Sequence, residues 1–126
     1  MRLRPCGASR KFMAFELRTR QAGDVTVIDF SGPITLSVAS SVIRNAVRDV
    51  LASGQKKLLL NLINVAYIDS YGIGEMVAGY SSVRNAGGTL KLLSLSHRVR
   101  EMLEITNLYN VFDVQEDEAM AISSFK

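Results

Sequence analysis

The stretch KLLLNLINVAYIDSYGIG, residues 57–74, contains the clearest change of pattern in the chain. Its first seven residues are almost continuously apolar, which is typical of a strand buried on both faces of a parallel sheet. Its last seven residues place an aspartate, a serine and two glycines where such a strand would give way to a helix. Ligand sites in α/β sheets gather beyond the carboxyl ends of strands. The stretch therefore predicts an α/β fold with its candidate site in the turn around Asp69 and Ser70.

The sequence on both sides of this stretch alternates between strand and helix patterns. In chain order we expect a β-hairpin and then alternating helices and strands, over residues 15–21 and 25–30, 37–53, 57–63, 70–86, 89–95, 97–106, 111–115 and 117–125. Gly54 is the expected left-handed cap of the first helix, and Ser96 the expected N-cap of the third. The order ββαβαβαβα predicts one α/β domain, a mixed sheet of about five strands covered by about four helices.

Ser70 is predicted at or near the N-cap of the second helix. A phosphate on its hydroxyl would meet unpaired backbone N–H groups and the positive end of the helix dipole. It would also add about −1.5 to −2 charges at pH 7. The alternative is that Ser70 is only a structural cap, with Gly72 and Gly74 letting the helix pack closely on the sheet. Local spacing alone leaves both interpretations open.

The basic character of the chain lies in its first residues. Four of the fifteen Lys and Arg residues precede Met13, whereas none of the twelve Asp and Glu residues does, so the remainder is nearly neutral. We expect residues 1–13 to be a disordered basic leader and residues 14–126 to be the domain. A basic tail could also touch RNA or another anionic surface, but the prediction is that the protein binds no nucleic acid.

The cysteine count and the hydropathy pattern indicate the compartment. Cys6 is the only cysteine, so no intramolecular disulfide can form. No apolar segment is long enough for a signal peptide or a membrane span. We therefore expect a cytoplasmic protein without membrane insertion.

Several motifs resemble those of the STAS family, the anti-sigma factor antagonists of bacteria. The family hallmark, apolar-Asp-Ser-(Ser/Thr)-Gly-Leu-Gly, is similar to residues 68–74. A Gly-Gly stretch before a strand is matched by residues 87–92. An apolar-x-x-Thr-x-Leu-x-x-x-Phe run is matched by Leu103, Thr106, Leu108 and Phe112. The resemblance covers residues 15–125.

The resemblance implies a phosphorylation switch in transcription regulation. In that family the unphosphorylated domain binds an anti-sigma factor that is also a serine-protein kinase, and phosphorylation releases it. By resemblance, Ser70 is the phosphorylated serine and Asp69 shapes its turn. The implied partner surface combines this turn with the loop over residues 31–35, through Asp69, Tyr71, Gly72, Ile73, Gly74, Gly32, Pro33 and Thr35. For Ile73 a place in the core is an equally open interpretation.

Two residues depart from the family pattern. Tyr71 stands where the family usually has Ser or Thr, and Thr35 stands where it commonly has Asp in a Gly-x-Leu-Asp motif. These departures leave a second interpretation open. The protein could be a constitutive STAS scaffold or an accessory subunit, for example of a stress-signalling or phospholipid-transport complex, that is never phosphorylated.

Catalytic and cofactor sites have weaker support. A nucleophile elbow around Ser70, with His97 as base, would need glycine where Ile68 stands. A phosphoacceptor role for Asp69 would need an acidic pair after the first strand, and only Asp29 lies there. A dinucleotide loop would need a third glycine at Val77. We therefore expect no enzyme activity, no cofactor and no metal site.

Overall fold

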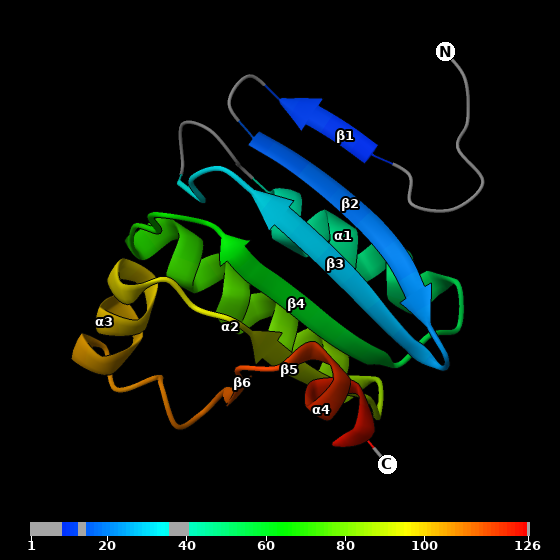
Figure 1. The fold of residues 1–126 in the computed structure, drawn as a ribbon. Helices are drawn as coiled ribbons and strands as arrows, with labels where there is room; N and C mark the ends of the chain where they lie inside the picture. Colours follow the sequence, from blue (N-terminus) through cyan, green and yellow to red (C-terminus); the bar gives the residue numbers. More distant parts are fainter. Residues whose placement is uncertain (1–8, 13–14, 36–40, 126) are drawn as a thin grey trace.

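The computed structural model describes residues 9–12, 15–35 and 41–125, and shows a six-stranded sheet with helices on both faces (Figure 1). The elements in chain order are β1 (Ser9–Phe12), β2 (Phe15–Ala22), β3 (Val25–Ser31), α1 (Val42–Ala52), β4 (Lys57–Asn64), α2 (Ser70–Asn85), β5 (Thr89–Leu93), α3 (His97–Ile105), β6 (Asp113–Gln115) and α4 (Glu118–Ser123). The predicted α/β class and the mixed sheet are confirmed.

The strands lie in the sheet in the same order as in the chain. Pairing is antiparallel from β1 to β3 and parallel from β3 to β6. The carboxyl ends of β3 and β4 therefore lie side by side at the same end of the sheet. The candidate site was predicted at this end.

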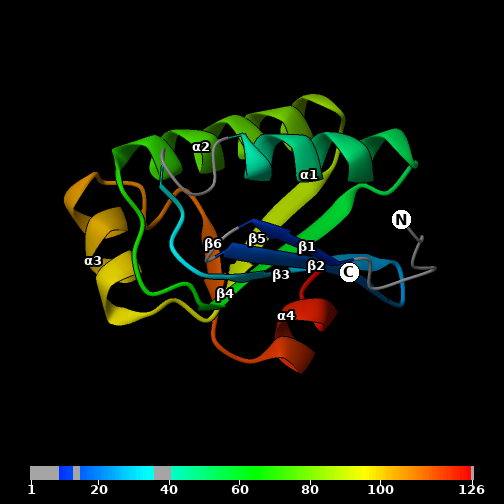
Figure 2. The same cartoon turned by 90° about the horizontal axis from the view of Figure 1, so that it is seen from above.

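The helices form two layers of unequal size. Seen from above, α1 and α2 lie side by side over one face of the sheet, and α4 lies on the other (Figure 2). Leu58, Leu60 and Leu62 belong to the large core under α1 and α2. Leu59 belongs to a smaller core that also contains Ala121 of α4. The two cores explain why β4 is apolar on both faces.

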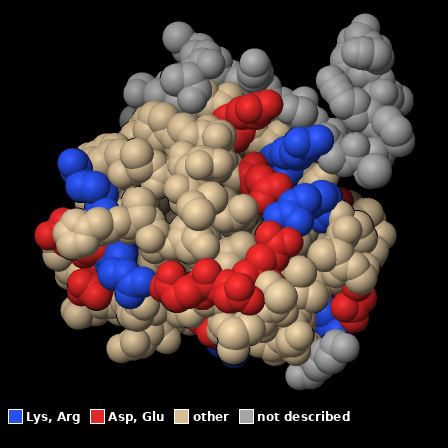
Figure 3. Space-filling model, viewed as in Figure 1, with Lys and Arg blue, Asp and Glu red and all other residues tan. Residues whose placement is uncertain are grey.

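Polar contacts hold α4 on its face of the sheet. The guanidinium of Arg20 donates to both carboxylate oxygens of Glu118, each at 2.8 Å. At the other end of the helix, Lys91 Nζ donates to Ser124 O at 2.9 Å and lies 5.0 Å from the centre of the Phe125 ring. The same face carries acidic and basic residues next to one another over β2 and β3 (Figure 3).

Strand β1 adds a sixth strand to the expected sheet. Ser9–Phe12 pairs antiparallel with β2, so the predicted disordered leader is corrected over these four residues. The physical reason is that β2 would otherwise be an edge strand with a row of unpaired backbone groups. Residues 1–8 and 13 of the predicted leader lie outside the described residues.

The helix ends agree with the expected caps, with some shifts in length. Gly54, after the C-cap Ser53 of α1, has φ 93°, and the hydroxyl of Ser96 accepts the N–H of Val99 at 3.3 Å. The predicted start of the first helix, residues 37–40, lies outside the described residues. The last strand is shorter than expected, Asp113–Gln115.

Candidate functional site

The turn between β4 and α2 is capped by Asp69. Its backbone is extended, and its Oδ1 accepts the backbone N–H of Gly72 at 2.9 Å. Ser70 is therefore the first helical residue, directly after the N-cap Asp69, in agreement with its expected place at or near the cap. Both residue types cap helices well, so composition alone could not choose between them.

The loop over residues 31–35 lies beside this turn and is joined to it by backbone hydrogen bonds. Ile34 N–H donates to Tyr67 O at 3.0 Å, and Asp69 N–H donates to Ile34 O at 3.3 Å. Gly32 N–H donates to Asn64 O at 3.1 Å. The two segments predicted to share one surface are thus adjacent in space. Gly32, Pro33 and Thr35 are each half-buried there.

One face of α2 at this end is exposed. Ser70, Gly74 and Val77 follow each other at helical spacing and are open to solvent. We call this set the α2 stripe. Its first member, Ser70, has a hydroxyl accessible at the positive end of the helix dipole.

Two of the predicted partner-binding residues are buried. Ile73 is only 7% exposed and belongs to the large core, which favours the core role that the sequence left open for it beside partner anchoring. Gly72 is also buried, and it packs so closely that a Cβ there would collide with the Ile34 carbonyl and the Ile68 side chain. Both residues fall on the side of α2 that faces the sheet, whereas Ser70 and Gly74 fall on the opposite side.

Tyr71 is half-buried and points toward α1. Its hydroxyl accepts the backbone N–H of Ser41 at 3.2 Å. One helical turn later, Glu75 is also bonded to α1, through the backbone and side chain of Arg44. Sequence reasoning missed Glu75. The signal that could have identified it is a charged residue at a position of α2 that the helical spacing turns inward.

A cation and an aromatic ring lie near the carboxyl end of β4. Tyr67 is 39% exposed, and the guanidinium carbon of Arg98 lies 5.2 Å from the centre of its ring. Exposed Tyr and Arg side chains are frequent in protein interfaces. His97, the residue before Arg98, is the exposed first residue of α3.

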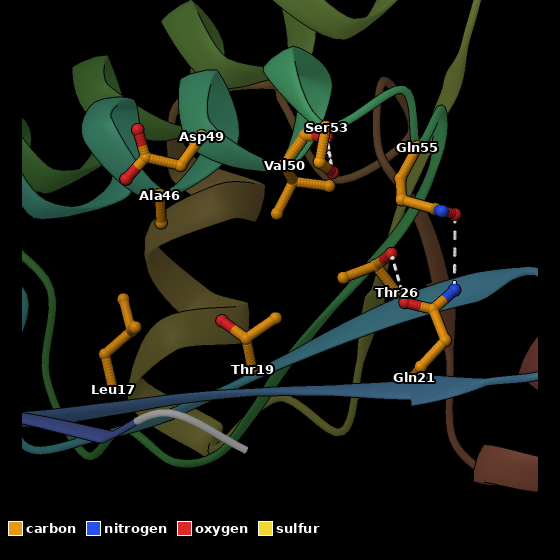
Figure 4. Close-up of a pocket in the computed structure, with 9 residues that line it drawn as sticks. All are labelled: Leu17, Thr19, Gln21, Thr26, Ala46, Asp49, Val50, Ser53 and Gln55. Carbon is orange, nitrogen blue, oxygen red and sulfur yellow. Dashed lines mark hydrogen bonds between the residues drawn. The ribbon is translucent and has the colours of Figure 1, made fainter. Parts of the chain in front are cut away.

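A hollow of about 250 Å³ lies at the opposite end of the sheet from the Ser70 turn (Figure 4). It is open between α1 and strands β2 and β3. Gln21 accepts a hydrogen bond from Thr26 and donates one to Gln55 at this hollow. These bonds satisfy the side chains internally and connect the hairpin to the segment before β4.

Asp29, the only acidic residue available for a phosphoacceptor pair with Asp69, is bonded elsewhere. Its carboxylate accepts from Arg20 at 2.7 and 3.2 Å and from Asn61 at 2.8 Å, on the face of the sheet that carries α4. Within the described ranges, no three His, Cys, Asp or Glu side chains group as metal ligands would. In the same part of the chain, no helix has the length and hydropathy needed to cross a bilayer.

The fold and the site define a class: a mixed-sheet α/β domain with an Asp-capped helix and an exposed serine at its first position. The model of the STAS domain family matches residues 16–121. The chain belongs to the STAS domain family, as its motifs indicated.

Individual relatives agree with this assignment. The anti-sigma-B factor antagonist of Bacillus subtilis is 38% identical over 64 residues, 51% of this chain and 59% of that protein. The aligned region thus spans less than two thirds of that relative. A protein of Thermotoga maritima has the same fold, with a TM-score of 0.80, 23% identity and 86% and 93% of the two chains covered. Unphosphorylated SpoIIAA, an anti-sigma factor antagonist, gives a TM-score of 0.73 at 16% identity, covering 86% and 94%.

Proposed function

We propose that this protein is an anti-sigma factor antagonist that binds an anti-sigma factor while unphosphorylated and releases it when Ser70 is phosphorylated. In this proposal the anti-sigma factor is also the serine-protein kinase. The protein itself is a regulatory binding protein of the bacterial cytoplasm and has no catalytic role.

The observation that carries the proposal is the setting of Ser70. It is exposed at the first position of α2, directly after the cap Asp69 and beside the loop over residues 31–35. A kinase can reach such a hydroxyl without unfolding the domain. The anti-sigma-B factor antagonist relative and the solved phosphorylated form of SpoIIAA, which has the same fold, support the same interpretation.

The physical basis of release is the charge of the phosphate. A dianion at Ser70 would lie next to the carboxylate of Asp69, in the middle of the surface that the partner covers. Burying a charge without a matching partner group costs several kcal/mol. Since about 1.4 kcal/mol changes affinity tenfold, one phosphate is enough to separate the two proteins.

The proposal predicts opposite effects for two substitutions at Ser70. Ser70→Ala should bind the anti-sigma factor as the unchanged protein does, because it adds no charge. Ser70→Asp should bind at least about tenfold more weakly, because it buries a carboxylate in the interface. Isothermal titration calorimetry with the purified anti-sigma factor measures both.

Ser81 provides the matched control. It is exposed on the same face of α2, about three turns and 16 Å from Ser70, so Ser81→Asp should leave affinity unchanged. Equal affinities for Ser70→Ala and Ser70→Asp would remove Ser70 from the interface. A constitutive scaffold or accessory subunit that uses the same surface would be recognised differently, by the lack of any ATP-dependent change at Ser70.

A further inference from the structure

Helix α1 begins without a side-chain cap of its own. Its N-cap residue, Ser41, has φ 62°, a left-handed conformation that costs energy for any residue with a side chain. No side-chain hydrogen bond from Ser41 reaches the first turn of α1. Among the residues that the structure describes, support for the start of α1 comes from another element.

That support comes from two successive turns of α2. Tyr71 Oη accepts the N–H of Ser41 at 3.2 Å, and Glu75 Oε1 accepts the N–H of Arg44 at 3.3 Å. Residues four apart in a helix lie on the same face, so both acceptors point at the same end of α1. Together they satisfy backbone N–H groups that a helix otherwise leaves unpaired.

Glu75 makes this contact specific. Its side chain is 0% exposed, and its Oε2 lies 2.5 Å from an Arg44 guanidinium nitrogen. A buried carboxylate is tolerated only when it is paired and hydrogen-bonded. The partner groups shown for Glu75 all belong to α1, so α1 cannot move away from α2 without leaving this charge unsatisfied.

The same part of α2 is fixed to the loop over residues 31–35. Asp69 N–H donates to Ile34 O, and Gly72 packs against the Ile34 backbone so closely that a Cβ would collide with it. The first two turns of α2 thus contact that loop on one side and the start of α1 on the other. Ser70 lies on the exposed face between these contacts.

We propose that Tyr71 and Glu75 are positioning residues that hold the first turn of α1 beside Ser70, so that the partner surface includes this turn and the side chain of Arg44. The partner is the anti-sigma factor of the proposed function, on which this inference rests. Arg44 exposes 57% of its side chain. It would present a cation to an acidic group of that partner.

Two substitutions test the proposal on the full chain. Tyr71→Phe removes only the hydroxyl, and Glu75→Gln removes the charge and replaces one of the two accepting oxygens by an NH2 group that cannot accept. Each should speed hydrogen exchange at the amides of Ser41 and Arg44 about fivefold, as measured by NMR, because each weakens a hydrogen bond there. Each should also weaken binding of the anti-sigma factor about three- to tenfold by calorimetry.

Tyr80→Phe is the matched control. It makes the same chemical change in the same helix, but the Tyr80 hydroxyl bonds to Arg84 and not to α1. It should change neither the two exchange rates nor the affinity. The effect of Glu75→Gln on affinity is the most informative result, because a fully buried side chain cannot touch a partner directly and its contacts shown here are to α1.

Unchanged exchange at Ser41 and Arg44 in both variants would overturn the proposal. The proposal would also be overturned if Glu75→Gln exchanged these amides faster but bound the anti-sigma factor as tightly as the unchanged protein does. If the unchanged protein does not bind the anti-sigma factor, the proposed function and the partner surface fail together. The exchange rates then still decide whether Tyr71 and Glu75 hold α1, since they need no partner.

Discussion

Gly72 and Gly74 lie two residues apart in the same helix but have different surroundings. A Cβ at Gly72 would collide with the carbonyl of Ile34 and the side chain of Ile68, whereas a Cβ at Gly74 would meet nothing within 4 Å. The first glycine therefore allows the helix to approach the sheet end, and the second leaves the α2 stripe open. The sequence pattern could not distinguish these two roles.

The pair gives a prediction about stability. Gly72→Ala should lower the free energy of unfolding by about 1–3 kcal/mol, because backbone and core must shift to admit the methyl group. Gly74→Ala should leave it unchanged or raise it by up to about 1 kcal/mol, since alanine favours an exposed helical position. Urea unfolding of both variants measures the difference. Equal effects at the two positions would contradict the packing described here.

At the residue scale the sequence predicted the place of the site better than the roles within it. It located the turn at Asp69 and Ser70 because the change from a strand pattern to a helix pattern is local. It did not separate cap from first helical residue, and it left Ile73 open between the partner surface and the core. Which way Ile73 points depends on where the helix starts relative to the sheet, which is a tertiary property.

At the scale of elements, α4 is held by contacts that the sequence does not reveal. Arg20 and Glu118 are 98 positions apart, and their bidentate pair forms only when the last helix packs on the sheet. The hydrogen bonds that Arg20 donates to Glu118 lower the pKa of Glu118, and the bonds that Glu118 and then Asp29 accept from Arg20 raise the pKa of Arg20. The pair therefore favours docking of α4 when Glu118 is ionised.

This pair predicts a pH-dependent loss of stability. Because the folded pKa of Glu118 lies below its usual value of 4.5, its contribution is present above that value and is lost as pH falls through the folded pKa. Glu118→Gln should lower the free energy of unfolding by about 0.5–1 kcal/mol at about pH 7, a modest value because both side chains are partly exposed.

At about pH 3 the difference in stability between the two proteins should be smaller than at about pH 7, because Glu118 takes up a proton as pH falls through its lowered folded pKa. Urea unfolding at both pH values measures the change. Glu101→Gln, on the exposed side of α3, is the control and should have no comparable effect. A difference at Glu118 that persists unchanged in acid would show that charge is not its cause.

At the scale of the whole molecule, the alternation of patterns was sufficient to predict the fold class. Buried strands such as β4 and amphipathic helices such as α1 repeat a local signal, and short connections restrict how they can be joined. Strand β1 was missed because its pairing depends on the open edge of β2 and not on a pattern of its own. The contact of Glu75 with α1 was missed for the same kind of reason.

The central claim is that Ser70 is the switch of this domain. The most direct measurement is peptide mass spectrometry of the protein after incubation with ATP and cell extract of its source organism, with Ser70→Ala treated in parallel. We expect one phosphate, on Ser70, and none on Ser70→Ala. No phosphate, or a phosphate on another residue that persists in Ser70→Ala, would contradict the claim.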